Sequence, residues 1–158
     1  MPSCTLAGGG RTRRPSHATV VDDTEVTRMR MAKEDVPVVL AVPGATARQF
    51  GPFGTTGDGD AMAAEWFSLA AGVDIAPLLE GLERDTCHAP HWGFLQSGAL
   101  EITYADGERE RVEGGDLFHW PPFHSVRVVD DAEVILFSPL RAHRSVIDHM
   151  ATKLGVTA

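Results

Sequence analysis

Between residues 91 and 138, short β-prone runs alternate with turn residues, and no other feature of the chain constrains its fold as strongly. The pair Asp106–Gly107 is typical of a two-residue hairpin turn, and the pairs GG, PP and DD separate the runs that follow it. The runs are HWGFLQSG, ALEITYA, ERERVE, DLFHW, HSVRVV and AEVILFS. Six short strands at this spacing predict an antiparallel β-sandwich or β-barrel.

The segments before this series add strands to the all-β prediction. We expect strands at 36–42, which is rich in β-branched residues, and at 45–50, whereas the glycine-rich stretch 51–60 reads as a loop. Residues 61–72 fit a helix or a strand by periodicity alone. We interpret them as a strand because the residues from Ala64 to Leu69 alternate between two faces.

Two further segments have the spacing of helices. In 74–84, apolar side chains recur at i, i+3, i+4 and i+7, which predicts a short helix after an Asp74 cap. The C-terminal segment 140–155 predicts an amphipathic helix that lies over a sheet edge or a partner. We expect His143 and His149 on that helix to be exposed. The apolar stripe of this helix comprises Leu140, His143, Ile147, Met150 and Leu154.

Composition restricts the classes of partner. The 158 residues carry a formal net charge of −8, and an acidic surface repels nucleic acid and anionic lipid. Residues 1–30 are rich in Gly, Arg, Ser and Thr, so we expect a disordered tail before a single domain at 31–158. The two cysteines, Cys4 and Cys87, fit a reducing compartment. No apolar run reaches the roughly 18 residues of a membrane span, and from the cysteine usage we expect a cytoplasmic protein.

The stretch CHAPHWG, residues 87–93, holds the first candidate metal ligands. Cys87 is either a soft thiolate ligand or a small buried side chain. His91 begins a strand, where a neutral imidazole can bind Zn, Fe, Ni, Cu or Mn; the alternative is a buried histidine satisfied by backbone hydrogen bonds. His88 points to the opposite face from Cys87 on an extended strand, so it is either a further ligand or a surface histidine.

A second group of candidates surrounds the pair Pro121–Pro122. His124 opens the next strand and is either a ligand that reaches the same cavity as His91 or a turn residue that faces solvent. His119 shares a face with Leu117 and is a candidate to line or cap the cavity. Most nearby aromatic side chains are expected in the core, with one or two lining an apolar pocket. The aromatic pocket candidates are Trp92, Phe94 and Trp120.

Residues 81–138 resemble a cupin, a small β-barrel whose two sequence blocks bring metal ligands into the barrel interior. Gly81 opens the first block and Gly98 closes it. The spacing back from Gly98 puts His91 in the position usually held by a glutamate. Cys87 and Asp85 then fall at the positions of the two histidines of this block.

The second block follows the same resemblance with two departures. Gly115 and Pro121 have the spacing of the cupin block, but Phe123 stands in place of its glycine. The usual histidine position falls on Val126, and His124 comes two residues earlier. More narrowly, the patterns C-x-x-P-H-W-G and G-D-x-x-x-x-P-P-x-H are similar to a group of small bacterial cupin-domain proteins.

The resemblance implies an antiparallel cupin-like β-barrel, or jelly roll, with a short helix before the barrel motif and a C-terminal helix. Although the residues of this chain depart from the cupin ligand pattern, we expect a divalent transition metal (Zn, Fe, Ni or Mn) bound by His91 and His124, with Cys87 or His88 as a third ligand. Cupin chemistries include dioxygenation, isomerisation and decarboxylation of small oxygen-containing molecules. The alternative is a non-catalytic module that binds a small organic ligand or dimerises, which the missing HxH motif and glutamate favour. We expect a homodimer with a small-molecule ligand and with no nucleic-acid or membrane partner.

Overall fold

The computed structural model describes residues 30–156, so the predicted N-terminal tail lies outside the described residues apart from Arg30. A 3₁₀ turn at Lys33–Asp35 precedes the sheet, α1 (Ala76–Leu79) and a second 3₁₀ turn at Glu83–Asp85 lie between its third and fourth strands, and α2 (Leu140–Leu154) follows the last strand. The strands are β1 (Val38–Val42), β2 (Ala45–Phe50), β3 (Met62–Leu69), β4 (His91–Tyr104), β5 (Arg109–Glu113), β6 (Leu117–Trp120) and β7 (His124–Pro139).

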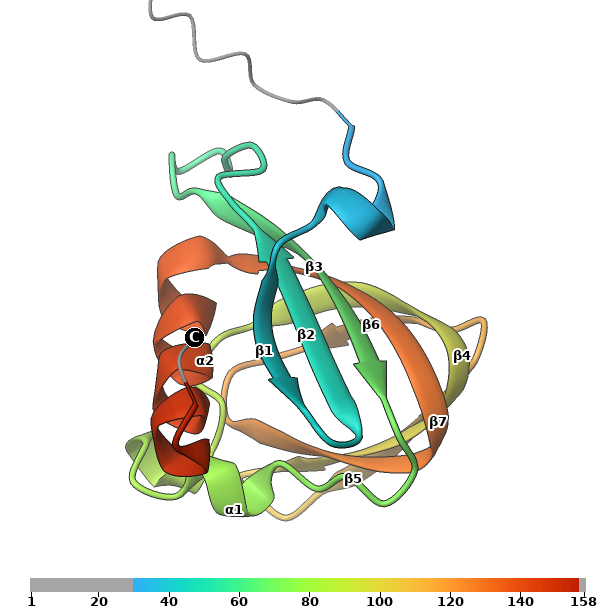
Figure 1. Cartoon of the computed structure of the whole chain (residues 1–158). Helices are drawn as coiled ribbons and strands as arrows, with labels where there is room; N and C mark the ends of the chain where they lie inside the picture. The colour runs from blue at the N-terminus through green and yellow to red at the C-terminus, as the bar shows by residue number, and fades with distance from the viewer. Residues whose placement is uncertain (1–29, 157–158) are drawn as a thin grey trace, which may run out of the picture.

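The seven strands form one antiparallel sheet in the order β1-β2-β3-β7-β4-β5, and β6 pairs with β4 beside this path. The sheet curls round a central space, with β1 to β3 across the front and β4 and β7 wrapping behind them (Figure 1). Helix α2 stands along one side of the barrel, next to β1 and α1. The predicted all-β barrel with a C-terminal helix is confirmed.

Strands β4 and β7 are each one long bent strand where the sequence predicted two short ones. Their register shifts on both sides of Ser97. The next residue, Gly98, has a φ of 87°, and a Cβ atom there would collide with the carbonyl oxygen of Asp131. Because a bulge bends a strand without ending it, the predicted turn at 130–131 is wrong. The carboxylate of Asp131 instead accepts a hydrogen bond from the backbone N–H of Ala71 at 2.8 Å.

The hairpin predicted at Asp106–Gly107 is confirmed, but its loop is longer than the predicted two residues, since β4 ends at Tyr104 and β5 begins at Arg109. The backbone N–H of Gly107 donates to the carbonyl oxygen of Tyr104 at 2.9 Å, and β4 pairs with β5 on either side of this turn. Gly107 has a φ of 91°, a conformation that costs glycine little because it has no Cβ atom.

Helix α1 is shorter than the predicted 74–84. The carboxylate of Asp74 accepts a hydrogen bond from the backbone N–H of Ala76 at 2.9 Å, so Asp74 does support the start of the helix. The helix ends at Leu79, and Gly81 takes a left-handed φ of 95° that breaks the helical path. The apolar spacing continues to Leu82 because this side chain packs against the same core from a turn.

The core has two parts. One part lies between β1, α1 and α2, where Val146, Ile147 and Met150 of α2 pack with Leu40 and Leu79. The apolar face of α2 therefore covers the protein's own barrel. The other part fills the end of the barrel formed by β4 to β7, and its fully buried members include Leu95, Leu100 and Ile102. Within residues 30–156, no helix combines the length and the apolar character needed to cross a membrane.

Candidate metal centre

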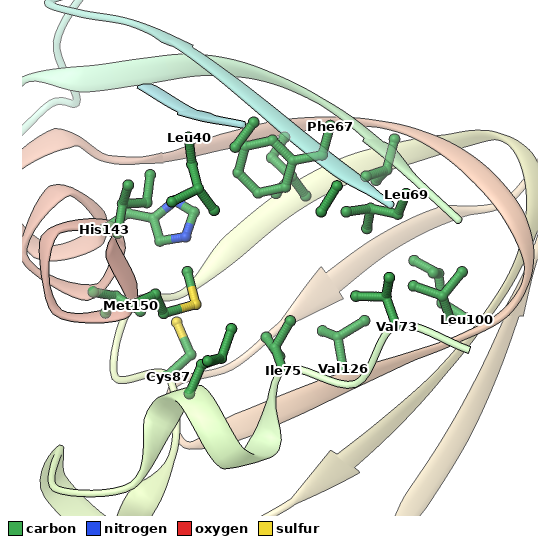
Figure 2. A pocket seen from close by; sticks show the side chains of 18 of the residues that line it. Leu40, Phe67, Leu69, Val73, Ile75, Cys87, Leu100, Val126, His143 and Met150 are labelled. Carbon is green, nitrogen blue, oxygen red and sulfur yellow. The ribbon is translucent and has the colours of Figure 1, made fainter. Parts of the chain in front are cut away.

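A cavity of about 130 Å³ lies inside the barrel, and residues of the sheet and of α2 line it. Most of the lining is aliphatic. Figure 2 shows Cys87, His143 and Met150 at one end of the cavity, with Val73 and Leu100 toward the other. The cavity therefore has an end that carries polar atoms and an end made of hydrocarbon. The side chains in the lining that could bind a metal are Cys87, His91, His124 and His143.

Cys87, His91 and His124 each bring one potential ligand atom within 4.8 Å of the others. The sulfur of Cys87 lies 3.4 Å from Nε2 of His91, and the two imidazole rings have centroids 5.1 Å apart. All three side chains are buried. A thiolate and two imidazoles form a donor set that suits zinc and iron, so these residues could hold a metal ion.

Main-chain pairing holds Cys87 beside His124. The backbone N–H of Cys87 donates to the carbonyl oxygen of His124 at 2.8 Å, and the N–H of Phe123 donates to the carbonyl oxygen of Cys87 at 2.6 Å. The ring nitrogen Nδ1 of His124 lies 2.7 Å from the carbonyl oxygen of Pro121. A carbonyl oxygen can only accept, so Nδ1 carries the proton and Nε2 keeps its lone pair for a metal.

A left-handed turn precedes His124. Phe123 occupies the glycine position of the second cupin block and has a φ of 72°, a conformation that favours glycine. His124 and Val126 both line the cavity from the same face of β7. His124 therefore faces the same cavity as Val126, the position where the cupin block usually has its histidine. Arg84 and Asp85, on the other side of Cys87, also have positive φ values. Backbone strain of this kind gathers at functional sites.

His91 is held by a buried relay of hydrogen bonds. The hydroxyl of Ser138 donates to Oε2 of Glu65 at 2.8 Å, so its oxygen accepts from Nδ1–H of His91 at 2.7 Å. The proton of His91 therefore lies on Nδ1, and Nε2 faces Cys87 with its lone pair free. Such a partner on the far nitrogen is how proteins orient a metal-binding histidine.

Glu65 at the other end of this relay was not among the predicted site residues. It is 2% exposed, and its carboxylate also accepts from Nε2 of Gln49 at 2.6 Å and from Nδ1 of His143 at 2.7 Å. Burial on its own would raise the pKa of Glu65, but the charge and hydrogen bond of His143, with the bonds from Gln49 and Ser138, hold that pKa below its ordinary value. Glu65 is therefore a carboxylate at neutral pH.

The expectation that His143 is exposed is wrong. The ring is 4% exposed and lines the cavity from α2 (Figure 2). Its centroid lies 4.3 Å from that of His91. The bond from Nδ1 to Glu65 turns the ring inward. His149 is partly exposed, and its Nε2 hydrogen-bonds the backbone carbonyl of Glu80 at 3.0 Å.

A second group, Glu65, His91 and His143, also has potential ligand atoms within 4.8 Å of one another. In that group, however, both oxygens of Glu65 are already engaged in hydrogen bonds from Gln49, Ser138 and His143. The bonds to Ser138 and Pro121 use Nδ1 of His91 and of His124, so both Nε2 atoms remain available beside Cys87. The cysteine-containing group is therefore the better metal site, and Glu65 orients its ligands.

Burial decides the protonation of the three candidate ligands. It raises the pKa of the Cys87 thiol to about 12, and the negative charge of Glu65 acts in the same direction. Burial also lowers the pKa of His124 to about 4. It lowers the pKa of His91 well below its ordinary value, as do the neighbouring His143 and His124. At neutral pH both imidazoles are neutral, and metal binding has to release the thiol proton of Cys87.

The other predicted site residues lie in different places. His88 is partly exposed and its Nε2 lies 3.2 Å from the hydroxyl of Ser145 on α2, away from the cavity. Trp92 and His119 stack on the outer face of the barrel with ring centroids 5.1 Å apart. Phe94 shares that outer side of β4, and the structure does not bring Trp92, Phe94 or His119 to this cavity.

Trp120 is the aromatic pocket candidate that does line the cavity. Its ring is 2% exposed and meets the ring of His91 edge to face, with centroids 6.1 Å apart. Asp85, at the position of the first cupin histidine, is exposed and accepts a hydrogen bond from the backbone N–H of Gly81 at 2.7 Å. That carboxylate stabilises the turn after α1.

No protein-family model matches the chain, and no curated protein matches its sequence. Among solved structures, the chain is similar to the oxalate decarboxylase of Lactobacillus farciminis in its formate complex, with 18% identity and a TM-score of 0.52. The match covers 72% of this chain and 33% of that chain. An RmlC-like cupin from Shewanella frigidimarina is 14% identical over 69% of this chain and 88% of that chain, with a TM-score of 0.47.

KdgF from Halomonas sp. is 20% identical, covers 68% of this chain and 90% of that chain, and has a TM-score of 0.46. At such identities the likeness concerns the fold, and activity has to be argued from the site. The curled antiparallel sheet, the two sequence blocks and the similarity to the decarboxylase agree with one another. The protein has the fold of a cupin.

Proposed function

We propose that this protein binds a divalent transition metal through Cys87, His91 and His124 and uses it on a small oxygen-containing organic molecule in the cavity. One observation carries the proposal: Cys87, His91 and His124 each bring one ligand atom within 4.8 Å of the others, and Nδ1 of each histidine is tied to a hydrogen-bond partner. This is the arrangement by which proteins fix the tautomer and direction of metal-binding imidazoles.

Charge balance supports the same site. The Cys87 thiolate and the Glu65 carboxylate each offset part of the positive charge that a divalent ion would bring into this low-dielectric core. An uncompensated charge in such a place is costly. Glu65 thus has two roles in the proposal, because it offsets charge at the centre and, through Ser138, orients His91.

The donor set narrows the choice of metal. Thiolate and imidazole suit zinc and iron, whereas manganese and magnesium prefer oxygen ligands. Three protein ligands leave a fourth position for water or substrate, as catalytic zinc sites do. When bound, such a metal polarises an oxygen of the substrate. The aliphatic walls of the cavity, among them Leu40, Leu136 and Ile147, keep bulk water away from that oxygen.

A second candidate function is a barrel that binds a small organic ligand without a metal. The aliphatic lining of the cavity favours it, because apolar walls with a few polar groups are typical of small-molecule sites. Both candidate functions place a small molecule in the cavity, so ligand binding alone does not distinguish them. The metal content of the purified protein does.

We also propose that the protein is a cytoplasmic homodimer. The apolar face of α2 is used within the chain, so support for a dimer comes from exposed apolar side chains on the outer face of β4, β6 and β7. Trp92 is 44% exposed and pairs with Phe137, which is 39% exposed, and Leu117 on β6 is 83% exposed. Light scattering of the wild type and of Leu117→Lys tests this face, because the charge would shift a dimer that uses it toward monomer.

Elemental analysis of the purified, tag-free protein tests the metal. We expect close to one zinc or iron per chain in the wild type and loss of that metal in the double variant His91→Ala/His124→Ala. A matched control is His88→Ala/His119→Ala, which removes two histidines that lie away from the cavity. Wild-type protein that takes up no metal after reconstitution under reducing conditions would favour the metal-free binding module.

A further inference from the structure

We infer that the cavity takes a neutral organic molecule about the size of benzene, with one oxygen atom that accepts a hydrogen bond from the indole N–H of Trp120. The hydrocarbon part of this molecule would lie among the aliphatic side chains at the end of the cavity that carries Val73 and Leu100 (Figure 2). The inference rests on the proposed function in using the same cavity as the substrate site. The hydrogen bond itself needs no metal, so it can be tested separately.

The observation behind this inference is an unpartnered polar atom. Trp120 is 2% exposed and lines the cavity, and its Nε1 has no hydrogen-bond partner among the described residues. An indole N–H can only donate, and a buried donor without an acceptor destabilises a protein. A ligand that brings an acceptor oxygen would remove this penalty whenever it binds.

The indole of Trp120 is fixed beside the candidate metal ligands. It stacks on the ring of Phe118 with centroids 3.9 Å apart and planes 11° apart. Its centroid lies 6.1 Å from that of His91 and 5.7 Å from that of His124. One oxygen atom of a small ligand can therefore be near both the N–H donor and the metal ligands.

The size and lining of the cavity define the rest of the ligand. The volume of about 130 Å³ is close to the roughly 150 Å³ of an engineered apolar cavity that holds benzene. Among the described residues that line it, none is Asp, Glu, Lys or Arg. A sugar or a polyacid would lose water at many polar groups and find few partners. A ligand with one oxygen loses hydration at only one polar group, and burial of its carbon atoms favours binding.

A pair of probes of nearly equal shape tests the hydrogen bond. Cyclohexanone carries a carbonyl oxygen where methylenecyclohexane carries a CH₂ group. The experiment titrates each probe into ¹⁵N-labelled, metal-free protein and follows the indole N–H resonances. The chain has three tryptophans, and the other two differ in environment. The indole of Trp66 already donates to Glu133 at 2.5 Å, and Trp92 lies on the outer surface.

We expect cyclohexanone to move the Trp120 indole proton resonance downfield and methylenecyclohexane to leave it nearly in place. In Trp120→Phe, which keeps a ring on Phe118, affinity for cyclohexanone should fall about five- to tenfold, as expected for loss of one hydrogen bond. Affinity for methylenecyclohexane should stay within twofold. Trp92→Phe, on the outer face, should bind both probes like the wild type.

Three results would overturn the inference: neither probe binds the folded protein, both bind equally well, or the Trp120 resonance responds alike to both. If Trp120→Phe does not fold, the two wild-type titrations still decide the question. Repeating them with zinc added separates this inference from the proposed function. Probe binding with the predicted resonance shift but without metal uptake would keep the ligand site and refute the metal.

Discussion

The sulfur of Cys87 lies 3.4 Å from Nε2 of His91, and that nitrogen has no proton of its own because Nδ1 donates to Ser138. The thiol, with a pKa of about 12, keeps its proton at neutral pH. A metal ion that enters this site takes the place of that proton. The relationship between these two residues therefore determines how metal binding depends on pH.

Metal affinity should rise about tenfold for each pH unit between about pH 6 and pH 8. Cys87 must release one proton per metal, whereas His124, with its pKa lowered to about 4, releases none in this range. Calorimetric titration of zinc in buffers with different ionisation enthalpies measures the number of protons. Cys87→Ser should bind far more weakly. An uptake that is independent of pH would contradict the assignment of Cys87 as a ligand.

Glu65→Gln should destabilise the protein by about 2–4 kcal/mol, because its carboxylate accepts from three buried side chains and an amide cannot accept from all of them. Urea unfolding of the metal-free protein measures the loss. Glu113→Gln, on an exposed pair with Arg111, is a matched control expected to change stability by less than about 1 kcal/mol. An equal change in the free energy of unfolding for the two variants would show that the hydrogen bonds of Glu65 stabilise the fold no more than an exposed ion pair does.

Part of this network carried a signal in the sequence. Glu65 alternates with Trp66 and shares its face with Phe67 and Leu69, so a carboxylate stands on an apolar face. His143 likewise interrupts the apolar stripe of the last helix. What could not be predicted is that these two residues meet, since 78 positions separate them and only the folding of α2 onto the barrel joins them. The cupin resemblance led us to expect His91 and His124 together with Cys87 or His88, and it is Cys87 that lies beside the two histidines.

The metal-free protein should lose stability as the pH falls from about 6.5 to about 4. In this window the unfolded chain takes up a proton on His124, whose ordinary pKa is 6.5, while the folded chain with a pKa of about 4 does not. The contribution of His124 to the free energy of unfolding is fully present above pH 6.5, is lost by about pH 4, and amounts to at most about 3 kcal/mol. His91 acts in the same direction.

Urea unfolding at a series of pH values measures this dependence. His124→Gln removes one of the two groups, so the slope of the unfolding free energy against pH should decrease even if the variant is less stable overall. An unchanged slope would mean that His124 is not held neutral by the fold.

Gly93→Ala should cost about 1–3 kcal/mol and disturb the tryptophan site. A Cβ atom at Gly93 would collide with the ring of Phe118 and with the carbonyl oxygen of Ile135. Because Phe118 stacks on Trp120, the indole fluorescence should change as well. Gly57→Ala is the control, since no heavy atom lies within 4 Å of a Cβ there. Similar stability of the two variants would contradict this packing.

The fold was predictable to the extent that it depends on local pattern. Alternation and turn residues identified the strands and the hairpin at Asp106–Gly107. They could not distinguish a turn from a bulge at 130–131. The difference depends on Gly98, which lies on the neighbouring strand and leaves room for the carbonyl oxygen of Asp131. A contact between residues on two different strands cannot be predicted from the local sequence of either strand.

The central claim, a metal held by Cys87, His91 and His124, is tested most directly by the absorption spectrum of the cobalt(II)-substituted protein. We expect intense visible bands of a tetrahedral site together with a near-ultraviolet thiolate-to-cobalt charge-transfer band. Cys87→Ser should remove the charge-transfer band, and Cys4→Ser should keep it. A weak spectrum typical of octahedral cobalt, or a charge-transfer band that survives in Cys87→Ser, would contradict the account.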